Sequence, residues 1–311
     1  MSILVSGSVA LDHIMYFPDR FKEHILPDKL HMLNVSFNIE SLVTHFGGVA
    51  GNIAYVLKLL GDDALILATA GSDFGPYAEW LERNAISRDG IRIIDDLRTA
   101  QGFVTTDLDD NQIWAFYVGA MARAHEARVQ DVSQPIEQAI VSSNGREAMV
   151  EHARELKRRG VPTWIDPSHG LPVLSRDELI ELIDGCAGYV VNDYEWSKTL
   201  EQTGLGEDEI ARRCDAVVIT KGDHGSEIRV DGDTIEIPPV AADQVVDPTG
   251  CGDAYRAGLL HARVRNHPWE TAGRIGSLLG SLQVGVEGPQ SLAIDLAVVK
   301  ARYQSEFGAN F

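Results

Sequence analysis

Residues 247–253, Asp-Pro-Thr-Gly-Cys-Gly-Asp, join a glycine-rich turn to a carboxylate at the start of a predicted helix. Gly250 and Gly252 let the backbone turn tightly and approach a ligand without a Cβ atom. Because the free N–H groups of a helix N-terminus point outward along the positive end of the helix dipole, such a turn binds anions. Asp253 would be an awkward neighbour for a phosphate unless it takes a proton from an attacking hydroxyl. The segment therefore predicts a kinase that phosphorylates a hydroxyl group.

The elements that must position this turn follow from an alternation of short apolar runs with helical patterns. Because strands that alternate with helices form parallel sheets covered on both faces, we expect an α/β fold with a central, mostly parallel sheet. Buried strands are predicted at 3–5, 64–70, 139–142, 163–166, 189–192 and 216–220. Helices are predicted at 51–60, 149–159, 177–183 and 208–214.

Two regions depart from this alternation. Residues 12–46 lack a strong helical period, and residues 101–117 alternate like a β-hairpin around a polar turn at 109–112. We expect one small sheet from both, a discontinuous lid from about 13–46 and 101–118 within a single domain spanning 1–311. Such a lid would exclude water from a kinase site and suppress hydrolysis of ATP. An ordinary antiparallel extension of the large sheet is the alternative.

Composition excludes several kinds of partner. The 46 acidic and 27 basic residues give a formal charge of -19, and the acidic residues are scattered, which argues against nucleic acid as a partner. Cys186, Cys214 and Cys251 form no Cys-x-x-Cys pair, so neither a disulfide framework nor a zinc site is expected. With no basic N-terminal region and no apolar run of membrane-spanning length, we expect a cytoplasmic protein without a membrane partner.

Nucleotide-binding motifs narrow the class of kinase. The sequence contains no Gly-x-x-x-x-Gly-Lys-Ser/Thr, and no Gly-x-Gly-x-x-Gly follows the first strand, which removes support for P-loop enzymes and dinucleotide dehydrogenases. Residues 247–253, 47–52 (GGVAGN) and 192–195 (NDYE) together resemble the signatures of the ribokinase-like, or PfkB, family of carbohydrate and nucleoside kinases. The resemblance covers essentially the whole chain. It implies a three-layer ribokinase-like fold with a small β-sheet lid.

Within the family, four segments look most like the bacterial adenosine kinases: residues 6–13, 48–52, 116–121 and 192–196. By this resemblance Asp253 is the catalytic base that activates the nucleoside 5′-hydroxyl. The backbone amides of Gly250, Cys251 and Gly252 form the anion hole, so Cys251 is expected to act through its amide and not as a nucleophile. The alternative for Asp253 is an ordinary carboxylate at a helix N-terminus.

The resemblance also assigns residues that hold the nucleotide and its cations. ATP would be bound by a loop similar to Thr-x-Gly-x-x-Gly, here Thr220, Gly222 and Gly225, together with Asn192. Asn192 and Glu195 resemble the pair that organises Mg²⁺ and its water shell, and helix capping by the same two residues is the alternative. Asp247 and the Thr249 carbonyl match part of a monovalent-cation site, which would hold K⁺.

On the acceptor side, Asp12 matches the carboxylate that binds sugar hydroxyls, and Gly48 and Asn52 match ribose-contacting positions. A carboxylate accepts two O–H donors and an amide both donates and accepts, so these groups suit a vicinal diol. As alternatives, Asp12 would end the first strand and Asn52 would cap a helix. The remaining nucleoside contacts implied by the resemblance are Ser8, Ser36, Phe103 and Phe116. Core packing is the alternative for the two aromatic residues, which otherwise offer faces for purine stacking.

The leading hypothesis is therefore an ATP-dependent, Mg²⁺-requiring purine nucleoside kinase of purine salvage, with adenosine as first candidate substrate. Residues 166–170 (DPSHG) lack the two glutamines that follow the serine in the actinobacterial adenosine kinases, which leaves inosine and guanosine open. A ribokinase-like kinase for ribose or fructose is the nearest alternative, although a bare sugar needs less flat apolar surface. A non-catalytic nucleotide-binding or nucleoside-binding protein is the alternative from another class. The resemblance further implies a homodimer that pairs through the exposed edge of the lid sheet.

Overall fold

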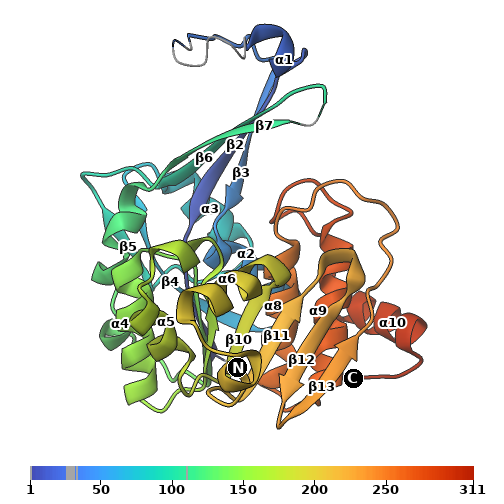
Figure 1. Ribbon diagram of the computed structural model, residues 1–311. Coiled ribbons are helices and arrows are strands. Elements are labelled where there is room, and N and C mark those ends of the chain that lie inside the picture. The colour runs from blue at the N-terminus through green and yellow to red at the C-terminus, as the bar shows by residue number, and fades with distance from the viewer. Residues whose placement is uncertain (1, 26–31, 33, 110) are drawn as a thin grey trace.

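The computed structural model describes residues 2–25, 32, 34–109 and 111–311. Residues 26–31 and 33 of the expected lid, and Asp110 of the expected turn, lie outside the described residues. Within them, the chain forms one large sheet and one small sheet (Figure 1). None of the helices in the described ranges has the length and apolarity needed to cross a membrane.

The large sheet has the strand order β13-β12-β11-β10-β9-β8-β1-β4-β5. Its strands are β1 (Ser2–Ser6), β4 (Asp63–Gly71), β5 (Ile91–Ile94), β8 (Gln138–Ser142), β9 (Thr163–Asp166), β10 (Gly188–Asn192), β11 (Ala216–Thr220), β12 (Ser226–Val230) and β13 (Asp233–Ile237). The pairs from β5 to β11 are parallel, and β12 and β13 add an antiparallel edge. The sequence predicted all of the parallel strands except the edge strand β5.

Helices cover both faces of the large sheet, because alternate side chains of each strand enter different hydrophobic clusters. Ile3 and Val5 of β1 belong to one cluster, whereas Leu4 belongs to the other. The first cluster is covered by α2 (Val49–Leu59), α3 (Gly75–Arg83), α8 (Cys251–Arg263), α9 (Trp269–Gln283) and α10 (Leu296–Phe307). The second is covered by α4 (Arg146–Arg158), α5 (Arg176–Ile183), α6 (Asp193–Thr203) and α7 (Glu207–Ala211). The three-layer α/β architecture expected from the sequence is confirmed.

The predicted helices at 51–60, 149–159 and 177–183 correspond to α2, α4 and α5. The prediction at 208–214 extends past the end of α7 at Ala211, where the chain continues as turns that lead into β11. Helices α3, α9 and α10 were not predicted, since their apolar residues alternate with several glycines or polar residues and the periodic signal is weak.

The small sheet has the order β3-β2-β6-β7 and projects from one end of the large sheet (Figure 1). Its strands are β2 (Ala10–Tyr16), β3 (Ser41–Gly47), β6 (Ala100–Thr106) and β7 (Gln112–Tyr117). Strands β6 and β7 pair antiparallel, so the predicted hairpin is confirmed. Strand β2 pairs antiparallel with β3 and parallel with β6, which joins the two segments into one sheet.

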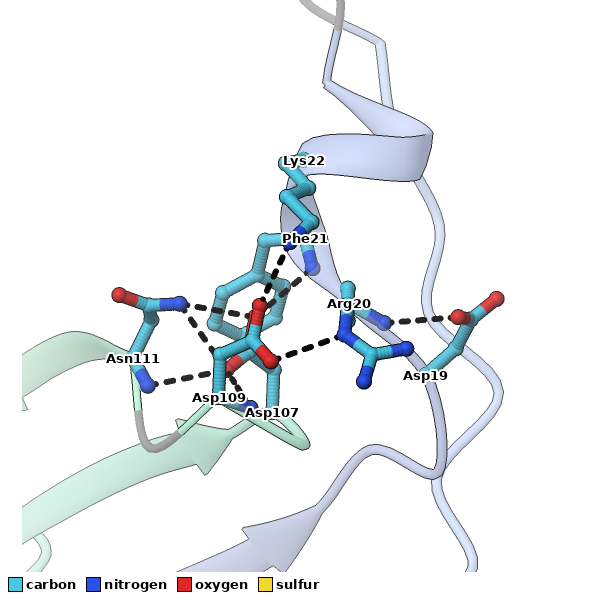
Figure 2. A network of polar contacts seen from close by, with 7 residues as sticks. All are labelled: Asp19, Arg20, Phe21, Lys22, Asp107, Asp109 and Asn111. Atoms are coloured by element: carbon cyan, nitrogen blue, oxygen red, sulfur yellow. Dashed lines mark hydrogen bonds and ion pairs between the residues drawn. The ribbon is translucent and has the colours of Figure 1, made fainter.

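The outer tip of the small sheet is tied together by one buried carboxylate (Figure 2). Asp107 accepts hydrogen bonds from the backbone N–H groups of Phe21, Asp109 and Asn111 at 2.8, 2.9 and 2.9 Å. Phe21 begins the short helix α1 (Phe21–His24), whereas Asp107 follows β6. The segment that contains α1 and the β6–β7 hairpin are therefore linked by hydrogen bonds to the Asp107 carboxylate as well as by strand pairing.

Candidate active site

The carboxyl ends of the parallel strands bring the expected nucleotide residues together. Asn192 at the end of β10 and Thr220 at the end of β11 are register partners, so they lie side by side. Thr220 leads into a turn that contains Gly222 at φ +57° and Gly225 at φ +82°. A Cβ atom at Gly225 would collide with the carbonyl oxygen of Ile237, so this turn requires glycine. Open α/β sheets bind their ligands at this edge.

Asn192 and Glu195 form a reciprocal capping box at the start of α6. The Asn192 Oδ1 atom accepts from the Glu195 amide at 2.7 Å, and Glu195 Oε2 accepts from the Asn192 amide at 2.9 Å. The alternative interpretation, a helix cap formed by Asn192 and Glu195, is therefore confirmed. Burial and the nearby charge of Asp166 raise the pKa of Glu195. Its second carboxylate oxygen takes no part in the cap and can accept hydrogen bonds from metal-bound water.

The turn before α8 is stabilised by Asp247. Its two carboxylate oxygens accept from the backbone amides of Thr249 at 2.9 Å and Gly288 at 3.0 Å. Gly250, the N-cap of α8, has φ +82°, and a Cβ atom there would lie 2.8 Å from Pro289. The loop around residues 288–289 therefore shapes the turn, although it lies far along the chain.

The three amides expected to form the anion hole are not equivalent. The Cys251 amide donates to the Pro248 carbonyl at 3.2 Å and is engaged within the turn. The amides of Gly250 and Gly252 donate to no other residue in the described part of the chain. Burial, with the charges of Asp247 and Asp253, raises the pKa of the Cys251 thiol to about 12, which disfavours the thiolate needed for a nucleophile.

Asp253 is the third residue of α8 and lies buried. Burial raises its pKa to about 6, while the Arg256 guanidinium and a hydrogen bond from Asn52 oppose that shift. Asn52 Nδ2 donates to Asp253 Oδ2 at 2.8 Å, and Arg256 Nη1 lies 3.7 Å from Asp253 Oδ1. The Asp253 carboxylate is thus ionised near neutral pH, and its Oδ2 atom is held by the hydrogen bond from Asn52.

Arg256 is a cation with 11% of its side chain exposed, and it was not among the site residues expected from the sequence. Its Nη2 atom lies 2.6 Å from Asp166 Oδ1, and a Cβ atom on Gly252 would lie 2.5 Å from its Nη1 atom. The guanidinium therefore sits directly beside the amide turn, between Asp253 and Asp166. A feature of the sequence that could have indicated Arg256 is its spacing of three residues from Asp253, which places both side chains on one face of α8.

On the acceptor side, Asp12 of β2 packs against Gly47 of β3, where a Cβ atom would collide with its carboxylate. Burial raises the pKa of Asp12 to about 6, and the charges of His45 and His13 oppose the shift. Gly48 has φ +84° and is the N-cap of α2. The alternative that Asn52 caps this helix is wrong, because Asn52 lies within α2 and bonds Asp253.

Ser8 and Ser36 occupy different surroundings. Ser8 Oγ accepts from the Val49 amide at 3.2 Å, so this hydroxyl caps the start of α2 next to Gly48. Ser36 is exposed in the segment before β3. Ser8 thus lies beside Gly48, whereas in the described part of the chain no hydrogen bond joins Ser36 to an expected acceptor residue.

The strand register separates the two expected aromatic residues. Asp12 pairs with Gly102, which pairs with Phe116, so Asp12 and Phe116 share one face of the small sheet. Phe103 lies on the opposite face, where its ring stacks on His13 with centroids 4.7 Å apart. Phe116 is 53% exposed and available to a ligand on the Asp12 face. The structure does not bring Phe103 to this face.

A buried polar cluster joins the acceptor and phosphate sides. Tyr77 of α3 lies within the electrostatic reach of both Asp12 and Asp253; burial raises the pKa of this phenol, and the charges of both carboxylates raise it further. Gln290 donates to Asn52 Oδ1 at 3.1 Å. Neither Tyr77 nor Gln290 carried a motif in the sequence. No cluster of three or more His, Cys, Asp or Glu side chains able to hold a metal occurs among residues with described positions.

The chain is similar to known kinases over nearly its whole length. Residues 6–295 match the model of a family described as pfkB family carbohydrate kinase. Nucleoside kinase from Methanocaldococcus jannaschii is 30% identical over 287 residues, which cover 92% of this chain and 91% of that protein. The structure of Burkholderia thailandensis nucleoside kinase in complex with inosine has a TM-score of 0.91 and 41% identity, covering 99% of this chain and 100% of that chain. The ADP-inosine complex of the same enzyme has a TM-score of 0.88 and 44% identity, covering 99% and 97% of the two chains.

Proposed function

Because the chain belongs to the pfkB family of carbohydrate kinases and is a phosphotransferase that acts on a hydroxyl group, we propose that it transfers the γ-phosphate of ATP to the 5′-hydroxyl of a purine nucleoside. Adenosine and inosine are the first candidate acceptors, and guanosine is the third. The proposal rests on one observation above all. Asp253 is a buried, largely ionised carboxylate at the start of α8, beside two free amides, and it shares with Asp12 an electrostatic effect on Tyr77.

Asp253 would act as the general base. Asn52 holds Oδ2, so Oδ1 is the atom that accepts the proton of the 5′-hydroxyl. As the nucleoside 5′-oxygen bonds to the γ-phosphorus, the bond from phosphorus to the β–γ bridging oxygen breaks and ADP leaves. The Gly250 and Gly252 amides would stabilise the charge that develops on the transferred group, because they are already oriented at the helix start. Arg256 lies beside Gly252 and would add a fixed positive charge.

The nucleoside would lie between the root of the small sheet and α2. The Asp12 carboxylate would accept both ribose hydroxyls, with Gly48 allowing close backbone approach and Ser8 beside it. Phe116 on the Asp12 face would stack on the base. The inosine bound to the Burkholderia thailandensis relative supports a nucleoside in preference to a bare sugar.

The residues at the carboxyl edge fit a divalent cation. The charges of Asp166, Glu195 and Asp253 all act on Arg256, and the charge of Asp166 also acts on Glu195. These carboxylates outnumber Arg256 and the nearby His169, and Mg²⁺ would compensate the negative charge that remains. We propose that Asn192 and Glu195 would hold it through water, and that it would supply positive charge to the nucleotide phosphates. Asp247 and the Thr249 carbonyl are the proposed K⁺ ligands, with Thr220, Gly222 and Gly225 beside the nucleotide.

We also propose that two copies pair through the small sheet. Strands β3 and β7 are its open edges, and the face opposite Asp12 exposes Leu42, Ile113 and Tyr117. Edges and apolar side chains of this kind favour association between copies.

The direct test is Mg²⁺-dependent ADP release from ATP with adenosine, inosine, guanosine, cytidine, ribose and fructose as acceptors. We expect turnover with purine nucleosides. Asp253→Asn should lower kcat by about 10²- to 10⁴-fold, the usual contribution of a general base, while ADP binding is retained. The matched control is Asp233→Asn, an exposed aspartate of β13. Turnover with sugars alone would identify a sugar kinase, and undiminished turnover in Asp253→Asn would contradict the mechanism.

A further inference from the structure

The Asn52 amide that donates to Asp253 is held from behind by a chain of buried hydrogen bonds. Trp80 Nε1 donates to Gln290 Oε1 at 2.9 Å, and Gln290 Nε2 donates to Asn52 Oδ1 at 3.1 Å. Asn52 Nδ2 then donates to Asp253 Oδ2 at 2.8 Å. We call this series, from Trp80 through Gln290 and Asn52 to Asp253, the relay. It joins helices α3, α2 and α8 to the segment that follows α9.

The direction of the relay is set at its start. An indole nitrogen only donates, so Gln290 must present its oxygen to Trp80 and its NH₂ group to Asn52. Asn52 must in turn present its oxygen to Gln290 and its NH₂ group to Asp253. A carboxylate is an acceptor, which is the partner that this orientation requires.

A side branch sets the same direction independently. Tyr77 donates its hydroxyl proton to the Gly47 carbonyl at 2.8 Å, so its oxygen accepts from Gln290 Nε2 at 2.6 Å. The Gln290 NH₂ group thus serves Asn52 and Tyr77 together. With its amide reversed, Gln290 would place its oxygen against two other oxygens. The Trp80 N–H, which only donates, and the Gly47 carbonyl, which only accepts, therefore select one orientation of Gln290.

Burial makes the alternative orientation costly. Asn52, Tyr77 and Gln290 are 5%, 0% and 4% exposed, so water cannot readily replace a lost partner. The relay also explains Gly51 of the glycine-rich segment 47–52. A Cβ atom there would collide with the Tyr77 hydroxyl and lie 2.9 Å from Gln290 Nε2. The glycine makes room for the relay next to Asn52.

We propose that Trp80 and Gln290 are positioning residues for phosphoryl transfer, which act by keeping the Asn52 NH₂ group on Asp253 Oδ2 so that Oδ1 faces the substrate hydroxyl. This inference rests on the proposed role of Asp253. Neither Trp80 nor Gln290 contacts the reacting atoms. Their effect passes through Asn52, which the family resemblance assigned only to ribose.

The relay also bears on the charge of the base. The hydrogen bond from Asn52 lowers the pKa of Asp253, against the larger effect of burial. The other charged groups that face Asp253 are Arg256 on its own helix, Asp166 at the end of β9 and His169 after it. None of these belongs to the relay. Disrupting the relay should therefore raise the pKa of Asp253 while leaving these neighbours in place.

The test compares Trp80→Phe and Gln290→Glu with wild type in kcat, KM and the acid limb of the kcat–pH profile. Trp80→Phe keeps an aromatic ring but removes the N–H that orients Gln290. We expect kcat to fall about 10-fold with KM for ATP nearly unchanged, and the acid limb to move to higher pH. Gln290→Glu presents an oxygen to Asn52 and should lower kcat by about 10- to 100-fold, since a hydrogen bond to a charged group is lost.

Trp269→Phe is the matched control. Trp269 begins α9, is half-buried like Trp80 and packs against Arg263, and its indole nitrogen donates to no residue in the described part of the chain. We expect a lower melting temperature at most, with the acid limb unchanged. If Trp80→Phe and Gln290→Glu lower stability and kcat without moving the acid limb, the relay is structural and the proposal is overturned. Wild-type kcat and pH profile in both variants would overturn it as well.

Failure of the proposed function can be distinguished from failure of the relay, because the wild-type protein itself would then phosphorylate no nucleoside. In that case the relay is tested by the carboxyl ¹³C NMR titration of Asp253 in the nucleotide-free protein. A higher pKa of Asp253 in Trp80→Phe than in wild type and Trp269→Phe supports the relay. An equal pKa in all three proteins overturns it.

Discussion

Asp253 combines burial, which opposes its charge, with two neighbours that support it. Burial raises its pKa to about 6, and Arg256 and Asn52 keep it from rising further. A general base works best when its pKa lies near the operating pH, because it is then both ionised and basic enough to accept a proton. At the residue scale, the site therefore balances desolvation against one ion pair and one hydrogen bond. Asp12 is poised at the same pKa of about 6 by a similar burial.

This balance predicts the pH dependence of the reaction. Below a pH of about 6, Asp253 becomes protonated and can no longer take a proton, so kcat/KM for the nucleoside should fall. Asp12 is protonated over the same range and loses part of its affinity for ribose hydroxyls. We expect log kcat/KM measured from about pH 8 to about pH 5 to fall with a slope steeper than one. Asp12→Asn should reduce the acid slope to one, and a flat profile would contradict both assignments.

At the scale of elements, the small sheet is a unit because its tip is cross-linked. Asp107 binds the backbone of α1 and of the β6–β7 turn, and Asp109 forms ion pairs with Arg20 and Lys22 at 2.8 and 2.9 Å (Figure 2). Asp107 is 1% exposed, whereas the two ion pairs are largely solvated. Buried carboxylate-to-amide bonds contribute more than exposed ion pairs, so Asp107 carries this connection. The tip is therefore held by side-chain contacts as well as by strand pairing.

Asp107→Ala should uncouple α1 from the β6–β7 turn. The free backbone N–H groups left behind cost about 1 to 3 kcal/mol locally, while the large sheet is untouched. We expect faster amide hydrogen exchange in residues 17–25 and 112–117 and a several-fold higher KM for the nucleoside, with kcat nearly unchanged. Asp109→Ala, which removes only exposed ion pairs, is the control. Unchanged exchange at residues 17–25 would show that strand pairing alone holds the tip.

At the scale of the whole molecule, the site depends on how α2 and α8 pack, because α2 carries Asn52 and α8 carries Asp253. The far ends of these helices are joined by Asp62, which is fully buried in the turn between α2 and β4. Its oxygens lie 2.6 Å from His261 and 2.7 Å from Arg265, near the end of α8. The two helices are thus tied at one end by Asp62 and at the other by Asn52 and Asp253.

Asp62→Asn should lower the free energy of unfolding by about 3 kcal/mol at neutral pH, because it removes the charge of a fully buried carboxylate that bonds both His261 and Arg265. Burial alone would raise the pKa of Asp62, but the hydrogen bonds from His261 and Arg265 hold it below its usual value. The stabilisation is therefore present above the unfolded-state pKa of about 4 and is lost as pH falls through the lower folded-state pKa.

Urea unfolding at neutral and acidic pH measures this difference. The gap between Asp62→Asn and wild type should narrow in acid. The control is Asp63→Asn, the adjacent exposed residue that pairs with Lys58 at 3.0 Å, for which we expect a change within about 0.5 kcal/mol. Equal effects of the two substitutions would contradict the role of Asp62.

The sequence by itself determined the α/β architecture, the hairpin and the turn at the start of α8. These features depend on neighbouring residues: apolar periodicity, β-alternation and glycines at positive φ are properties of short segments. The motifs at 47–52, 192–195 and 247–253 were recognisable for the same reason. The Asn192–Glu195 capping box could also be anticipated, since its two partners are three residues apart.

Only the tertiary structure decided which side chains meet. Trp80 and Gln290 are 210 residues apart, and Gln290 and Asn52 are 238 apart, so no local pattern indicates that they share hydrogen bonds. The separation of Phe116 from Phe103 likewise depends on strand register, because adjacent residues of a strand face opposite sides of the sheet. Arg256 acquires its place between Asp253 and Asp166 only when β9 packs beside α8. Hydrogen-bond direction and burial depend on tertiary packing. Packing brings together segments that are far apart in the sequence, and no local sequence pattern indicates these contacts.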